Sequence, residues 1–110
     1  MTNVISIQST VLNDLVGNQA ARYILSSKKY NFFEIPTIAL TSHKAHKNSI
    51  QLHSKNLNPW QIFNSLKKTY KFGSKDFTII GYTPDLSTAR SVQKIIGKQN
   101  NILLDPVMGD

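Results

Sequence analysis

The amino-acid sequence predicts an α/β protein built on a parallel sheet flanked by helices. Apolar segments with the pattern of strands take turns along the chain with segments of helical periodicity. The stretches between successive strands are long enough for βαβ crossovers, which favour parallel strands covered by helices on both faces. With 110 residues, 40% of them hydrophobic and 17% charged, the chain suits at most one domain with a modest core.

Four segments are expected to be strands. Residues 4–8 alternate branched apolar and small polar side chains, which is typical of a strand. Three further apolar segments complete the set. In chain order the expected strands are 4–8, 32–40, 77–81 and 101–104.

Three helices are expected between these strands. The first opens at Gly17 or Asn18 and runs to about Lys28. The second begins at Asn58 and Pro59, an N-cap followed by a first-turn proline. Its core-facing side chains are expected to be those at helical spacing together with the tryptophan, namely Pro59, Trp60, Phe63, Leu66 and Tyr70.

The third helix is expected to start at Thr83 and Pro84 in the same way. Gly97 is its expected C-cap, because glycine is common just past helix ends. The inward-facing side chains of this helix are expected to be Leu86, Ala89, Val92 and Ile95.

The charge pattern argues against nucleic acid as a partner. The net charge is +7, but only two basic residues are arginines, and the lysines are scattered rather than gathered in a stripe.

No apolar run reaches the ~18 residues of a membrane span, and the N-terminus lacks the features of a signal peptide. Without cysteine there is neither a disulfide framework nor a thiolate metal site. A cytoplasmic protein is expected.

Residues 41–56 form the one long stretch without a regular pattern. Loops of this length in compact domains are often lids or binding loops, so a lid-like loop is expected here. Ser9, Lys44, Tyr82 and Asp105 each follow a different expected strand. Because the carboxyl ends of parallel strands meet at the edge where open α/β sheets bind ligands, these side chains are expected to share one site.

Three histidines in or beside this loop raise a zinc site as an alternative. His43, His46 and His53 are close in sequence, but no cysteine, aspartate or glutamate lies between them to complete a ligand set. Solvent-facing loop histidines are the preferred interpretation.

Three motifs resemble those of pyridoxal kinases, which are ribokinase-like enzymes. They are the first strand with its following loop, residues 5–9 and 16–21; Gly-Tyr-Thr at 81–83; and Asp-Pro-Val-Met-Gly-Asp at 105–110. The resemblance implies a three-layer α/β/α fold. It also implies ATP-dependent phosphorylation of the 5′-hydroxyl of pyridoxal, with pyridoxine and pyridoxamine as related substrates, in pyridoxal 5′-phosphate salvage.

The same resemblance implies roles for individual residues. Ser9 falls on a serine that contacts the pyridine ring, Val16 on a residue that lines the ring pocket, and Tyr82 on an aromatic residue beside the substrate. Asp105 falls near ATP and a cation, which is Mg²⁺ with a possible monovalent ion, and Asp110 falls near Mg²⁺. From the residues alone, Ser9 could instead bond its own turn, Tyr82 could cap the sheet edge, and Asp105 could belong to an ordinary Asp-Pro turn.

Lys44 departs from the family pattern. It occupies a position where many pyridoxal kinases have a threonine, within residues 41–46. Threonine offers a compact hydroxyl to the substrate, whereas lysine brings length and charge. Lys44 could meet the substrate aldehyde or phenolate, but relaxed selection at this position is the preferred interpretation.

The resemblance covers the chain but only the first part of the family's length. The Gly-rich turn that supplies the phosphate cradle and the aspartate base has no counterpart, since no Gly-x-Gly-Asp sequence occurs. Residues 1–110 are therefore expected to be the truncated N-terminal part of a kinase domain, inactive alone, with no catalytic residue. A homodimer or a missing C-terminal partner is expected. The alternatives are a non-catalytic α/β binding module and a fragment of a hydroxymethylpyrimidine kinase.

Overall fold

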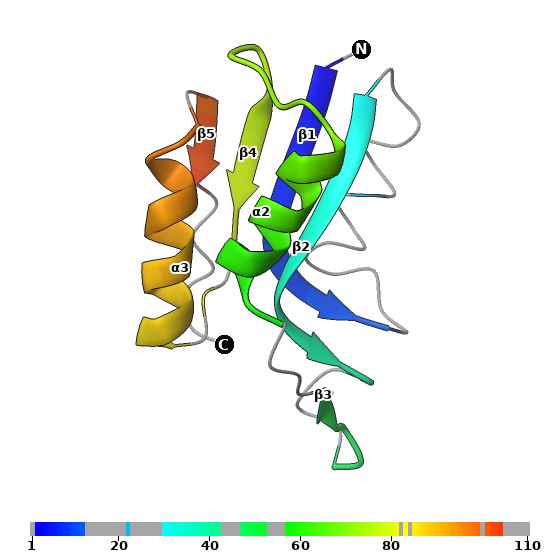
Figure 1. Ribbon diagram of the computed structural model, residues 1–110. Coiled ribbons are helices and arrows are strands. Elements are labelled where there is room, and N and C mark those ends of the chain that lie inside the picture. Colours follow the sequence, from blue (N-terminus) through cyan, green and yellow to red (C-terminus); the bar gives the residue numbers. More distant parts are fainter. Residues whose placement is uncertain are drawn as a thin grey trace.

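A computed structural model of the chain describes residues 2–12, 22, 30–42, 47–52, 57–81, 83, 85–99 and 101–104. In these ranges five strands form one sheet, and two helices pack on it (Figure 1). Neither helix is long and apolar enough to cross a membrane. The elements are β1 (Thr2–Val11), β2 (Tyr30–Leu40), β3 (Gln51–Leu52), α2 (Pro59–Thr69), β4 (Phe77–Ile80), α3 (Leu86–Ile96) and β5 (Asn101–Leu104).

The sheet confirms the α/β prediction, with one difference. Its order is β3-β2-β1-β4-β5, and the four predicted strands pair in parallel. The short strand β3 is antiparallel to β2, so the sheet is mixed rather than purely parallel. β1, the first strand in the chain, is central, between β2 and β4.

The stretch 41–56 is not wholly irregular, because it contains β3. The chain turns back on itself after β2: Thr41 N–H donates to Ile50 O at 2.9 Å, and Ile50 N–H donates to Thr41 Oγ1 at 2.9 Å. The Ser49 hydroxyl adds a bond of 2.6 Å to Ser42 O. A hairpin of this kind satisfies backbone groups that an open loop would leave to water. The lid-like role itself stays a prediction.

β1 and β2 extend further than the sequence predicted. Predicted as 4–8 and 32–40, they run from Thr2 to Val11 and from Tyr30 to Leu40. The added residues are largely polar, but each strand gains a parallel neighbour along its length. Tertiary pairing thus overrides the local apolar pattern that set the predicted limits.

Helix α2 begins as predicted. The side chain of Asn58 accepts a hydrogen bond from Gln61 N at 3.2 Å, and Pro59 occupies the first turn. Phe63 is fully buried, but Tyr70 was wrongly assigned to the helix core. It lies at the C-cap with an extended backbone and is 47% exposed, because the helix ends at Thr69.

Helix α3 begins later than predicted. Its N-cap is Asp85, whose carboxylate accepts a bond from Thr88 N at 2.7 Å, and not Thr83. Leu86 was expected to face the core but is 66% exposed. Nine positions separate it from the buried Ile95, which is about two and a half helical turns, so the two side chains lie on opposite sides of the helix. Gly97 is the C-cap, as predicted.

The hydrophobic core lies between one face of the sheet and the two helices. Figure 1 shows α2 and α3 on the same side of the sheet. Side chains that pair across parallel strands share a face, so this face carries the odd-numbered residues of the centre of β1. The buried cluster consists of Ile5, Ile7, Ile35, Phe63, Ile80, Val92 and Ile95.

Candidate functional site

Ser9 is the only predicted site residue that falls in the described part of the chain. It lies within β1, which continues to Val11, and not after the strand as predicted. The strand continues because β2 still pairs with it there. β4 ends at Ile80, opposite Ile7, so β1 has no β4 neighbour beyond that point. Ser9 therefore lies at the carboxyl edge of β4.

The pairing of β1 with β2 is irregular at Ser9. Gln8 lies opposite Pro36, whereas Thr10 lies opposite Ala39, so β2 has one residue more than β1 between these pairs. Such register shifts bend the strands and often adjoin functional sites. In Figure 1 the ends of β1 and β2 curve away from β4 together.

A buried hydroxyl without a partner lies in the same irregularity. Thr37 falls between the two paired positions of β2 and is 6% exposed, yet within the described residues its Oγ1 makes no hydrogen bond. Buried polar side chains are rarely left in this state, and functional sites are among the places where it occurs. Thr37 is thus an unsatisfied hydroxyl on the strand beside Ser9.

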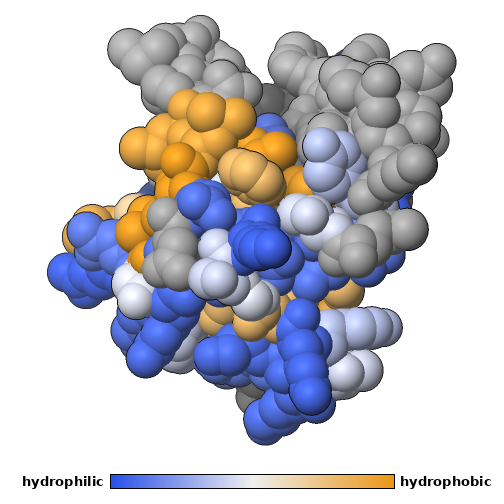
Figure 2. All heavy atoms as spheres, turned by 90° about the horizontal axis from the view of Figure 1, so that it is seen from above, coloured by the Kyte–Doolittle hydropathy of each residue, from blue (hydrophilic) through white to orange (hydrophobic). Residues whose placement is uncertain are grey.

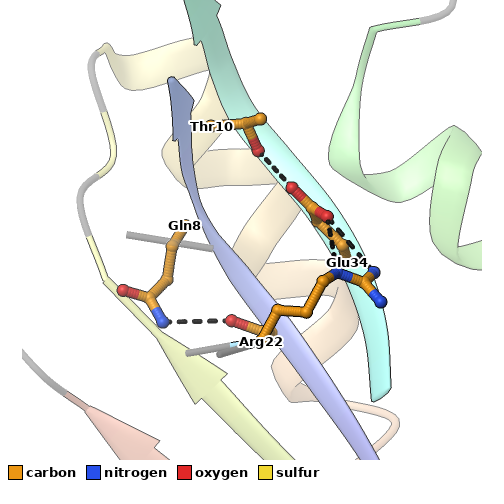
Figure 3. A network of polar contacts seen from close by, with 5 residues as sticks. Gln8, Thr10, Arg22 and Glu34 are labelled. Atoms are coloured by element: carbon orange, nitrogen blue, oxygen red, sulfur yellow. Dashed lines mark hydrogen bonds and ion pairs between the residues drawn. The ribbon is translucent and has the colours of Figure 1, made fainter. Parts of the chain in front are cut away.

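Gly81 allows the chain leaving β4 to pass close to β1. Its N–H donates to Ile7 O at 2.9 Å. A Cβ at this position would lie 2.8 Å from Gln8 Oε1 and 2.9 Å from Gln8 Cγ, closer than real contacts allow. Gln8 is 8% exposed and its Nε2 donates to Ser6 Oγ at 3.0 Å (Figure 3), so its side chain is not free to move aside. The close approach therefore requires glycine.

A second set of hydrogen-bonded polar side chains links the connection between β1 and β2 to the sheet. The Thr10 hydroxyl donates to Glu34 Oε2 at 2.7 Å, and Arg22 donates to Glu34 Oε1 from Nη2 at 3.2 Å and from Nε at 3.4 Å (Figure 3). The guanidinium of Arg22 also lies 4.7 Å from the ring centroid of Phe32. Because Glu34 is bonded on both oxygens, we interpret it as an anchor of this connection rather than as a free base.

The other predicted site residues, Val16, Lys44, Tyr82, Asp105 and Asp110, lie outside the described residues, as do the three histidines. Their positions therefore stay predictions. Of the strands that precede three of them, β4 and β5 end side by side, with Ile80 opposite Leu104. β2 continues further, to Leu40 opposite Val11, four residues beyond the Ile7 that pairs with Ile80. Within the described ranges, no three acidic or histidine side chains are grouped to hold a metal ion.

One carboxylate at this edge has a perturbed acidity. The hydrogen bond from the backbone N–H of Thr88, with help from the Thr88 hydroxyl, lowers the pKa of Asp85 below its usual value. The cause is the N-cap geometry, which favours the charged form. Asp85 is fully exposed and acts as a helix cap.

The sequence analysis missed three polar residues of this site. Gln8, Thr37 and Glu34 were read as ordinary strand residues, although each is a polar side chain within an apolar strand pattern. A polar residue that interrupts such a pattern often marks a buried hydrogen-bond network or a ligand contact. That signal was present for all three.

Two shallow hollows lie away from this edge. One is along α2, lined by Gln61, Ile62, Ser65 and Leu66. The other is at the amino-terminal edge of β1 and β2, where it is lined by Asn3, Asn31, Phe32, Phe33, Tyr70 and Lys71. Neither is lined by a predicted site residue.

Comparisons with known proteins agree with the fold and with the motifs. No family model matches the chain. The chain is 32% identical to the pyridoxal kinase of Ovis aries over 115 aligned residues, which cover 97% of this chain but 36% of the sheep enzyme. The chain therefore spans little more than a third of the length of that relative.

Solved structures give the same result. A pyridoxal kinase from Leishmania donovani in complex with ADP and pyridoxamine superposes with a TM-score of 0.77 at 26% identity, covering 100% of this chain and 41% of that one. For a pyridoxal kinase from Lactobacillus plantarum the TM-score is 0.82 at 18% identity, with 100% and 40% covered, and this likeness shows the fold alone. The chain is thus similar to the N-terminal part of pyridoxal kinases and has their ribokinase-like fold.

Proposed function

We propose that this chain forms the vitamin-binding part of a pyridoxal kinase, which transfers a phosphoryl group from ATP to the 5′-hydroxyl of pyridoxal, pyridoxine or pyridoxamine in the cytoplasm. The observation that carries the proposal is the place of Ser9. In a chain related to these kinases, its hydroxyl lies at a register shift on the carboxyl edge of β4. Ligands of open α/β sheets bind beyond this edge.

The pocket would combine one polar contact with apolar walls. The Ser9 hydroxyl would hydrogen-bond the pyridine ring, and Val16 and Tyr82 would enclose its faces. Gly81 supports the placement of Tyr82, because its close approach to Gln8 starts the segment after β4 directly beside β1. A few placed polar groups within an apolar lining are typical of small-molecule sites.

The nucleotide side would begin at the end of β5. Asp105 and Asp110 follow this strand, and carboxylate oxygens suit Mg²⁺ and monovalent cations. When bound, ATP would supply the phosphoryl group and Mg²⁺ would offset the negative charge of its phosphates. The chain would contribute these two carboxylates and the orientation of the vitamin.

Catalysis by the chain alone is not expected. Phosphoryl transfer depends on a positioned phosphate cradle and a base for the attacking hydroxyl, and the sequence contains no Gly-x-Gly-Asp motif that would supply them. The isolated chain should therefore bind vitamin weakly and show no turnover with ATP and Mg²⁺. Turnover that Asp105→Ala abolishes would contradict this part of the proposal.

A calorimetric titration tests vitamin binding. Pyridoxine is the better ligand, because it lacks the aldehyde that forms imines with lysines. Ser9→Ala should weaken binding about three- to tenfold, the effect of one lost hydrogen bond. Lys44→Thr should strengthen binding, because a compact hydroxyl replaces a long charged side chain.

Two results would contradict the pocket. In one, neither Ser9→Ala nor Lys44→Thr changes the affinity for pyridoxine. In the other, Ser9→Ala and a matched serine control on the exposed side of α2, Ser65→Ala, lower the affinity equally. Ser65 is exposed on α2 and lines a hollow that includes no predicted site residue, so its substitution should have no effect.

A further inference from the structure

Lysines that are scattered in the sequence come together at the amino-terminal edge of the sheet. Figure 1 shows that α2 and α3 both end at this edge, where the chain then turns into β4 and β5. Lys71 follows the C-cap of α2, Lys75 lies just before β4, and Lys98 lies between α3 and β5. All three are exposed. We define the lysine row as these three residues.

The lysine row follows the order of the strands. The carbonyl oxygen of Lys71 accepts a hydrogen bond of 3.1 Å from Asn3 Nδ2, which places Lys71 over the start of β1. Lys75 leads into β4 and Lys98 into β5, and β1, β4 and β5 are neighbours in that order. Figure 2, which looks down on this edge, shows hydrophilic residues over most of the side that carries the helices. Folding thus forms a basic stripe that the sequence does not display.

No described residue neutralises the lysine row. Asp76 follows Lys75 directly, but it is buried and its carboxylate accepts hydrogen bonds from N–H groups of Asn3 and Gly73. A lysine in the last turn of a helix can stabilise the helix dipole, but this effect falls off within that turn and does not account for lysines outside the helices. Positive charge gathered without a counter-charge favours a negatively charged partner.

The hollow at the amino-terminal edge continues the lysine row from Lys71 toward β2. Phe33 and Tyr70 in its lining form an edge-to-face pair, with ring centroids 4.9 Å apart. Phe33 also packs against Phe72 at 5.2 Å, so the pair is attached to the core. Tyr70 is 47% exposed and presents part of its ring to a partner. The corner between two such rings suits one further aromatic side chain.

We propose that the lysine row and the adjoining hollow bind an extended acidic segment of a partner protein, which places an aromatic side chain in the hollow and carboxylates along the row. From β2 to β5 is about three strand spacings, roughly 14 Å, which about four or five extended residues cover. Ammonium groups are compact charges that pair with single carboxylates. Aromatic anchors in pockets carry much of the affinity at interfaces.

A nucleic acid has the same charge, but the geometry favours a polypeptide. Base stacking uses rings that present their faces in succession, whereas Tyr70 and Phe33 meet at 60°. Three lysines also neutralise few phosphates, and affinity for nucleic acid rises with that number. The inference is independent of the proposed kinase reaction, because ligands of parallel sheets bind beyond the opposite, carboxyl edge.

Fluorescence anisotropy tests the proposal with the full 110-residue chain and a labelled peptide. The peptide has a tyrosine between two runs of glutamates, so that it fits the row in either direction. Binding should saturate and should weaken as salt rises, because exposed charge pairs are screened. The double variant Lys75→Gln, Lys98→Gln should bind about fivefold more weakly.

The matched control removes the same positive charge elsewhere, in the double variant Lys47→Gln, Arg90→Gln. Lys47 lies between β2 and β3, Arg90 lies within α3, and both are exposed. The net charge falls equally in the two double variants, so the control should bind within about twofold of the native chain. Circular dichroism melts establish that both variants fold.

A second peptide, in which serine replaces the tyrosine, tests the hollow separately. The native chain should bind the tyrosine peptide about three- to tenfold more tightly, because the ring is removed from water. Tyr70→Ala should abolish most of this difference. Comparing the two peptides on one variant removes any general loss of stability from the result.

Three results would overturn the proposal: no saturable binding of the tyrosine peptide, equal losses in the two double variants, or equal affinity of the native chain for the two peptides. A short single-stranded oligothymidylate that binds more tightly than the tyrosine peptide, and that Lys75→Gln with Lys98→Gln weakens, would assign this surface to nucleic acid instead.

Discussion

At the amino-terminal edge of the sheet the polar groups bond to one another, whereas near the carboxyl edge one buried hydroxyl has no partner among the described residues. Near the start of β1, the buried carboxylate of Asp76 accepts hydrogen bonds from Asn3 N at 3.0 Å, Asn3 Nδ2 at 3.1 Å and Gly73 N at 2.7 Å. Asn101 of β5 joins this group by donating to Asp76 O and Ser74 O. The side chains at the amino-terminal edge thus bond to one another and to the backbone, and we call this edge closed.

The carboxyl edge has a different construction. There β1 and β2 lose their register at Ser9, and Gly81 leaves no room for a side chain. The buried hydroxyl of Thr37 has no partner in the part of the chain that the structure describes. At the amino-terminal edge the polar groups hold the strands together, whereas the Thr37 hydroxyl has no such role among the described residues. If the proposed function is right, stability and vitamin binding are divided between the two edges.

The largest expected effect is at the closed edge. Asp76→Ala should lower the free energy of unfolding by about 3 kcal/mol, because it leaves the N–H groups of Asn3 and Gly73 without their carboxylate acceptor. Chemical denaturation measures this loss. Pyridoxine binding by the folded fraction should not change, and a weakened vitamin affinity at full folding would show that the two edges are not independent.

Two glycines give a sharper comparison of the edges. Gly81→Ala should cost about 1–3 kcal/mol and weaken pyridoxine binding, because the new Cβ collides with the held side chain of Gln8. Gly73→Ala at the amino-terminal edge should be nearly neutral, since a Cβ there meets nothing within 4 Å. Thermal melts and titrations on both variants check this. Equal tolerance of the two alanines would remove the argument for a required close approach at Gly81.

The sequence predicted the local features of the fold well because their causes are local. The Asn58–Pro59 helix start and the Gly97 C-cap depend on side chains within a few residues, and both are confirmed. Thr83 was wrong as an N-cap because Asp85, two residues later, caps the helix by accepting from Thr88 N–H, and aspartate is the better N-cap residue. The inward direction predicted for Leu86 was wrong for another reason: steps of three residues drift around a helix, so Leu86 lies opposite Ile95.

Features that depend on partners distant in the chain could not be predicted in this way. The extension of β1 to Val11, the antiparallel β3 and the register shift at Ser9 all follow from pairing between segments far apart in sequence. The bond between Thr10 and Glu34 joins residues 24 positions apart, and no local pattern encodes it. Motif resemblance found Ser9 itself, but not the Thr37 hydroxyl beside it.

The smallest expected change in stability comes from replacing two buried threonines, Thr37 and Thr78. Their comparison separates the two edges most directly. Thr37→Val should leave stability unchanged or raise it by about 1 kcal/mol, since the substitution removes a buried hydroxyl that bonds to nothing within the described ranges. Thr78→Val is the matched control. Thr78 is fully buried in β4 and donates to Gln99 Oε1 at 3.4 Å, so its loss should destabilise by up to about 1 kcal/mol.

Vitamin binding then decides what the Thr37 hydroxyl does. If it is kept for a ligand or for a water beside Ser9, Thr37→Val should weaken pyridoxine binding while the protein is at least as stable as before. Thr78→Val should show the reverse, lower stability with unchanged affinity in the folded fraction. Denaturation and calorimetry on the same preparations measure both quantities. A Thr37→Val protein that is less stable and binds pyridoxine normally would mean that this hydroxyl supports the fold, and that the carboxyl edge is as closed as the amino-terminal one.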